Sequence, residues 1–107
     1  MLYKFKSKAT GDIIMLEPQG KQILTIIGKE PGAKGIIEVH DMLQAIDALR
    51  AAVKKEEDAQ AQAKAQAEQE GEPVPRFEGL GLRQRVVPFI DMLQRAHAND
   101  ADVVWGV

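Results

Sequence analysis

The sequence predicts an α+β domain, in which a small sheet of N- and C-terminal strands is covered by about three helices, two of them long and antiparallel. Three observations carry this prediction. The first residues, Leu2–Ser7, alternate apolar and Lys side chains with the period of two that a half-buried strand has. Two long stretches, Val39–Ala67 and Leu80–Ala98, repeat apolar residues at helical spacing. The last residues, Asp102–Val107, are rich in Val and Trp and predict a second strand.

The length and composition set bounds on what the protein can be. The chain has 107 residues, so we expect residues 1–107 to form a single domain. A domain of this size buries only about 60–65% of the surface of its unfolded chain, and self-association would add to that thin margin. The net charge of −2 argues against a protein built mainly to neutralise nucleic-acid phosphates. The absence of Cys excludes disulfides, thiol catalysis and cysteine-based zinc sites.

The segment Asp12–Gly28 allows two interpretations. A short apolar run, Ile13–Leu16, is followed by a Pro-x-Gly turn signal and then by the mostly β-branched residues Ile23–Ile27, which together read as a hairpin. Alternatively, a helix covers Pro18–Ile27, with the proline in its first turn and Gly28 as the residue that ends it. Periodicity alone does not separate the two over so few residues.

Residues 28–38 are predicted to connect this segment to the long helix. Three Gly residues (Gly28, Gly32 and Gly35) and Pro31 punctuate a loop over Gly28–Gly35. The loop superficially suggests a phosphate-binding loop, but Gly35 follows Lys34 where that motif needs the magnesium-binding Ser or Thr. We therefore interpret the glycines as turn residues, and Ile36–Glu38 as a short apolar approach to the helix.

The long helix over Val39–Ala67 has two different halves. Its first half carries one apolar stripe, formed by Val39, Met42, Leu43, Ile46, Leu49 and Val53. From residue 54 to residue 70 the chain uses only Ala, Gln, Lys, Glu and Asp, so nothing larger than Ala is available to bury. We expect residues 54–75 to be a polar insertion, either a projecting helix or a linker, because Pro73 and Pro75 end any helix.

The last helix carries a second stripe, formed by Leu82, Val86, Phe89, Ile90, Leu93 and His97. Pro88 lies inside this stripe and predicts either a kink or a helix start close to Val87. We expect the two stripes to face each other through Leu43 and Leu93. Trp105 is expected to close the core from the terminal strand.

The best candidate site for a ligand is the start of the last helix. Gly79 and Gly81 expose backbone N–H groups before a helix, and Arg83 and Arg85 follow closely. This arrangement could bind an anion such as a phosphate. The signal is weak, because the dinucleotide fingerprint needs a third Gly and a preceding strand. The alternative interpretation is a flexible segment followed by Arg side chains on a solvated helix face.

Two histidines lie near carboxylates, His97 near Asp100 and Asp102, and His40 beside Asp41. Each group could form an acid/base pair or a metal site, but neither has a diagnostic spacing. We therefore favour structural roles and predict no catalytic residue, no metal and no cofactor.

Three segments carry a resemblance to a known family: Leu2–Lys8, Leu82–Leu93 and Asp102–Gly106. Together they resemble a small bacterial protein family catalogued as domain of unknown function 1840. The resemblance spans nearly the whole chain except the Ala/Gln tract. It implies a helix rather than a hairpin over the residues that follow Glu17. It supplies no activity, cofactor or catalytic residue.

For function, the sequence favours a small non-enzymatic binding or regulatory protein that can self-associate. An alternative is a module that binds an anion or nucleic acid through Arg76, Arg83 and Arg85, although nucleic acid is not an expected partner. A weaker alternative is an enzyme that uses His97 with Asp100 or Asp102. The N-terminus has no signal-peptide pattern and no segment is long and apolar enough to span a membrane, so we expect a cytoplasmic protein.

Overall fold

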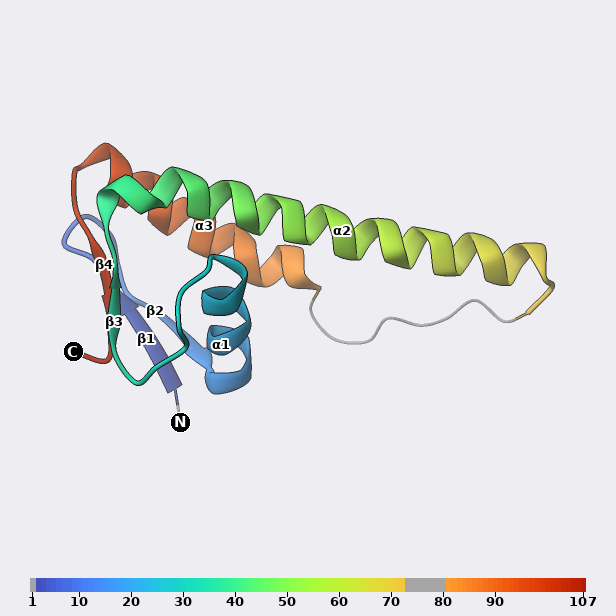
Figure 1. Ribbon diagram of the computed structural model, residues 1–107, viewed down its shortest axis with the longest axis horizontal. Coiled ribbons are helices and arrows are strands. Elements are labelled where there is room, and N and C mark those ends of the chain that lie inside the picture. The colour runs from blue at the N-terminus through green and yellow to red at the C-terminus, as the bar shows by residue number, and fades with distance from the viewer. Residues whose placement is uncertain (1, 73–80) are drawn as a thin grey trace.

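The computed structural model describes residues 2–72 and 81–107, which form an α+β fold (Figure 1). All three helices lie on the same side of a four-stranded antiparallel sheet (Figure 1). In chain order the elements are β1 (Leu2–Lys6), β2 (Ile13–Leu16), α1 (Glu17–Ile26), β3 (Gly35–Ile37), a 3-10 turn (Val39–Asp41), α2 (Met42–Gln69), α3 (Leu82–Ala98) and β4 (Val103–Trp105).

The sheet has the strand order β2-β1-β4-β3, so the first and last strands pair at its centre. Phe5 lies opposite Trp105 in this central pair, which confirms the predicted pairing of the N- and C-terminal strands. The sheet also contains β3, where the sequence suggested only an approach to the long helix. Three residues are too few for a periodic pattern, and β3 is a strand because Ile37 lies opposite Val103 and Ile36 opposite Val104.

Aromatic side chains of the central strands connect the sheet to the helices. Tyr3 and Phe5 of β1 are both buried, and the Phe5 ring lies edge-on to the Phe89 ring of α3 at a centroid distance of 4.9 Å. Trp105 is also buried, with its ring centroid 5.9 Å from that of Phe5. The expectation that Trp105 belongs to the core is therefore confirmed. Aromatic pairs at these distances add to the stabilisation that burial alone provides.

The segment Asp12–Gly28 contains a strand followed directly by a helix. Ile13–Leu16 forms β2, and α1 begins at Glu17 with its proline in the first turn. Gly28 adopts a φ of 83° and ends the helix, while the Lys29 N–H donates to the Leu24 carbonyl at 2.8 Å. The helical interpretation of residues 18–27 is confirmed, and the hairpin interpretation is wrong for its second strand.

The long helices α2 and α3 run antiparallel and pack against each other, as predicted (Figure 1). Leu93 is fully buried, but Leu43 is 57% exposed, so the expected contact through Leu43 is wrong. The buried stripe of α2 passes instead through Met42, Ile46 and Leu49. Leu43 lies one residue after Met42, about 100° further around the helix, and this rotation takes it out of the interface.

Helix α3 begins at Leu82 and passes through Pro88 without ending. The predicted start near Val87 is therefore wrong. The position tolerates proline because Val86 and Phe89, on either side of it, are both buried against the core. Their burial offsets the loss of one backbone hydrogen bond. The first residue that the sequence assigned to this helix, Leu80, lies outside the described residues.

The second half of α2 projects beyond the other described elements (Figure 1). The last α2 residue in the central core is Val53, yet the helix continues to Gln69. The radius of gyration is 16.0 Å, against about 13 Å for a compact domain of this length. Ala67 is the one residue of the polar tract, within the described range, that is classed as buried. That residues 54–75 are an insertion in a single domain stays a prediction, and residues 73–75 lie outside the described part.

We expect that residues 58–70 can be replaced by a short Gly/Ser linker with little loss of stability. Glu57, just before the replaced tract, is in contact with Arg83 at the start of α3, so a short linker has only a small distance to span. The free energy of unfolding should fall by less than about 1 kcal/mol, as for surface changes. Urea unfolding of the two proteins checks this. A loss of several kcal/mol would show that the tract packs, and would contradict the prediction.

Candidate functional site

The N-terminus of α3 is bound by a carboxylate of α2. Gly81 is the N-cap residue, and the backbone N–H of Leu82 donates to Glu56 Oε2 at 3.1 Å. A carboxylate suits this position, because the first N–H groups of a helix lack intrahelical acceptors and carry partial positive charge. The place where the sequence suggested an anion site therefore holds an anionic group of the protein itself. Gly79 and Arg76 lie outside the described residues.

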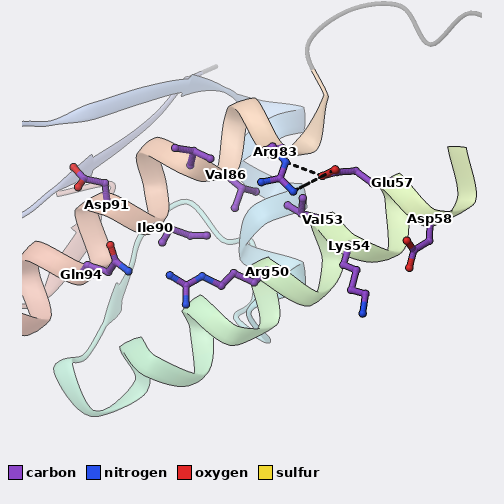
Figure 2. Close-up of a pocket in the computed structure, with 11 residues that line it drawn as sticks. Arg50, Val53, Lys54, Glu57, Asp58, Arg83, Val86, Ile90, Asp91 and Gln94 are labelled. Atoms are coloured by element: carbon purple, nitrogen blue, oxygen red, sulfur yellow. Dashed lines mark hydrogen bonds and ion pairs between the residues drawn. The ribbon is translucent and has the colours of Figure 1, made fainter. Parts of the chain in front are cut away.

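Arg83 and Arg85 point to different helices. Arg83 binds Glu57 of α2 in a two-pronged geometry, with Nε–Oε1 at 2.7 Å and Nη2–Oε2 at 3.2 Å (Figure 2). Arg85 donates from Nη1 to Gln22 Oε1 of α1 at 3.0 Å. The structure does not bring the two guanidinium groups together at one point. An anion at Arg83 would have to compete with Glu57.

A cleft of about 610 Å³ lies between α2 and α3 (Figure 2). Its apolar lining includes Val53, Val86 and Ile90, and Arg50 extends across it from α2 (Figure 2). The charged groups along its sides are of both signs: Arg50, Lys54, Glu57, Asp58, Arg83 and Asp91. This mixture gives the cleft no clear preference for an anionic or a cationic ligand. Among the described residues that line it, there is no His, Ser, Thr, Cys or Tyr.

His97, Asp100 and Asp102 do not form the acid/base group that the sequence suggested, and both Asp residues have structural roles. Asp102 Oδ1 accepts a hydrogen bond from the Val39 N–H at 3.2 Å, at the start of the 3-10 turn. Asp100 has a φ of 53° and ends α3, where the Ala101 N–H donates to the Ala96 carbonyl at 2.9 Å. Across the described residues, His97 forms no hydrogen bond or ion pair with either Asp.

His40 does contact carboxylates, but in solvent. Its ring nitrogens lie 3.3 Å from Glu38 and 3.4 Å from Asp41, and 73% of its side chain is exposed. The three side chains lie close enough to share a metal ion. Exposed acidic groups commonly gather without one, and a neighbouring Lys29 amine lies 3.3 Å from Asp41. The group is a solvated cluster around a helix start.

A different surface stands out at the edge of the sheet. Leu2, Ile14 and Leu16 are 57%, 58% and 56% exposed. Leu2 lies opposite Leu16 in the pairing of β1 with β2, so the three side chains share the face away from the helices. In the described part of the chain, no helix covers that face. We call these three residues the β2 patch.

A second apolar surface adjoins the β2 patch. Strand β2 and the beginning of α3 line a cleft of about 660 Å³, whose walls are more apolar than polar. Pro88, Gln84 and Arg85 form the helix side of this cleft, and Gln19 belongs to α1. Because β2 is an edge strand, its outward backbone N–H and C=O groups lie beside this cleft. Edge strand, patch and cleft together form one interaction surface.

Sequence reasoning identified the strand run Ile13–Leu16 but not this surface. One signal was present: all four residues are apolar, whereas a strand with one wet face alternates apolar and polar residues. A strand apolar on both faces exposes one of them when helices cover only one side of the sheet, and at a sheet edge it also leaves backbone groups unpaired. The edge position depends on the strand order, which the short run itself does not encode.

The fold and this surface define a small α+β domain that packs its helices on one sheet face and leaves an apolar edge open. The chain belongs to the family described as Domain of unknown function (DUF1840), whose model matches residues 1–105. The resemblance seen in the sequence is thereby confirmed. No curated protein and no solved structure matches the chain. Among the helices of the described residues, none combines the length and apolar character needed to cross a membrane.

Proposed function

We propose that this protein is a small, non-enzymatic binding protein of the bacterial cytoplasm whose partner is another copy of itself, held through the β2 edge. One observation carries the proposal. The three residues of the β2 patch are all more than half exposed, and they lie together on an edge strand. Contiguous exposed apolar surface on a small protein usually marks a binding surface or an aggregation hazard.

The chemistry of β2 supports a binding role. Natural edge strands are usually protected by Lys, Pro, a bulge or a covering loop. Strand β2 consists of Ile, Ile, Met and Leu, so it contains neither Lys nor Pro. The opposite edge, β3, is shorter and begins with Gly35. The two edges therefore differ, and β2 is the one suited to accept another strand.

The test is the effect of a charge in the patch on self-association. Wild-type protein should sediment faster as its concentration rises, whereas Ile14→Lys should sediment as a monomer throughout. The physical reason is that pairing would place the new ammonium group among apolar side chains of the partner strand, where it loses apolar contact and part of its water. Analytical ultracentrifugation measures this, with circular dichroism to verify that each protein is folded.

Thr25→Lys is the matched control, since Thr25 is exposed on α1 and lies outside the patch. It adds the same charge and should associate like the wild type. A wild-type protein that stays monomeric at every concentration would overturn the proposal. Equal association of Ile14→Lys and wild type would do the same.

A further inference from the structure

We infer that two copies pair their β2 strands antiparallel, about a two-fold axis at Met15, and so extend the sheet to eight strands. This inference rests on the proposed function and specifies how the two copies meet. Each copy contributes four strands in the order β2-β1-β4-β3, with β2 at one edge. Edge-to-edge addition satisfies the free backbone groups of both β2 strands at once.

Symmetry restricts the register of such a pair to two choices. In an antiparallel pair related by a two-fold axis, residue i faces j of the partner and j faces i, so one residue faces itself. Residues directly opposite each other point to the same sheet face, so both copies keep their helices on one side. For a strand of four residues, Ile13–Leu16, the self-facing residue is either Ile14 or Met15.

The side chains favour Met15 as the self-facing residue. In that register the Ile14 of each copy lies opposite the Leu16 of the other copy. The β2 patches of the two copies then join on one face of the sheet. In the other register Asp12 lies opposite the partner's Leu16. Its carboxylate would then lose water beside an apolar side chain, which is unfavourable. The Met15 register instead brings Ile13 opposite the partner's Glu17, on the helix side, and that carboxylate keeps its contact with Lys21 at 2.7 Å. Asp12 is only weakly compensated, because its ion pair with Lys4 spans 3.5 Å and is exposed.

The ends of β2 do not oppose the approach of a second copy. Each end carries one acidic and one basic side chain in contact: Asp12 with Lys4, and Glu17 with Lys21 at 2.7 Å. The hydrogen bond between these two side chains, together with the opposite charge of the partner, lowers the pKa of Glu17 and raises the pKa of Lys21. Both ends are therefore locally neutral when the two strands lie side by side.

The helix side of the edge also has room for the pairing. Met15 points toward the helices, where it is partly buried against the core. The cleft of about 660 Å³ between β2 and α3 lies beside it. Met has an unbranched, flexible side chain that fits irregular gaps, so two facing Met15 side chains can share this space. On the opposite, open sheet face, Ile14 and Leu16 of the two copies become cross-strand neighbours, and their contact removes part of the apolar patches from water.

Cysteine cross-linking tests the register, because the natural chain contains no Cys. Ile14→Cys and Leu16→Cys are made separately, and both sites are more than half exposed, so the fold should tolerate them. Opposite residues in an antiparallel pair have Cα atoms about 4.5–5.5 Å apart, within disulfide range. Diagonal residues are about 7–8 Å apart, outside that range.

Under mild oxidation we expect a disulfide-linked dimer when the two variants are mixed. When either variant is oxidised alone, we expect no disulfide-linked dimer to form. Ile36→Cys, on the opposite sheet edge, is the control and should stay uncross-linked. Cross-linking of Ile14→Cys with itself would overturn the register at Met15. Association in the ultracentrifuge without any β2 cross-link would overturn the inference and leave the proposed function standing. A monomeric wild type would overturn both.

Discussion

Leu93→Asp is expected to unfold the protein. Leu93 is fully buried on α3, in the core shared by the sheet and the helices. Removing a buried Leu side chain costs about 2–5 kcal/mol, and a carboxylate without a partner adds several more. The whole free energy of unfolding of a domain is about 5–15 kcal/mol, and small domains lie near the lower end. Circular dichroism should show lost secondary structure, with no cooperative urea transition remaining.

Leu43→Asp provides the matched control for this experiment. It makes the same chemical change on α2, but at a side chain that is 57% exposed. We expect its free energy of unfolding to lie within about 1 kcal/mol of the wild-type value. If Leu93→Asp unfolded at nearly the wild-type urea concentration, the packing of α3 described above would be wrong. Loss of folding in Leu43→Asp would contradict the observed rotation of α2.

Trp105→Ala should lower the free energy of unfolding by about 3–5 kcal/mol. The indole is 2% exposed, and its Nε1–H donates to the Gly32 carbonyl at 3.1 Å. Its ring also lies directly against Gly35, where an added Cβ would overlap it. The substitution therefore leaves a cavity at the centre of the sheet and releases the loop before β3. Far-ultraviolet circular dichroism in urea measures the loss, because Trp105 is the single Trp of the chain.

Trp105→Phe separates the two contributions. A Phe ring retains much of the contact with Phe5 but cannot donate to Gly32. We expect a smaller loss than for Ala, because Gly32 also accepts a hydrogen bond from the Tyr3 hydroxyl at 3.2 Å. Equal losses for the Ala and Phe variants would assign the stabilisation to the hydrogen bond. A loss below about 1 kcal/mol for Trp105→Ala would contradict the burial of the ring.

The sequence was sufficient for the elements with a long or clean pattern. The alternation around Tyr3 and Phe5, the two long helices and the terminal Val-Val-Trp all occur where they were expected. The sequence was insufficient to predict elements whose local patterns are short or ambiguous. Strand β3 depends on pairing with β4, and the exposure of Leu43 depends on how α2 is rotated against α3. Both are set by contacts distant in sequence.

The candidate sites show the same limit. Arg83 and Arg85 are two residues apart, and the sequence suggested that they act together. Because the two side chains leave α3 in different directions, one guanidinium meets Glu57 of α2 and the other meets Gln22 of α1. The edge position of β2 is also a property of the assembled sheet. Residues that are separated by tens of positions along the chain decide both arrangements, so no local motif could reveal them.

The central pairing of β1 with β4 has a consequence for the order in which the protein folds. Phe5 and Trp105 are neighbours in the sheet, although nearly the whole chain separates them. The hairpin of β1 and β2 needs only nearby residues, whereas β4 must close a loop of about a hundred residues, at a high entropic cost. During synthesis, β3 has no neighbour in the sheet until β4 emerges. Completion of the sheet is therefore a late, non-local step, which we expect to limit the folding rate.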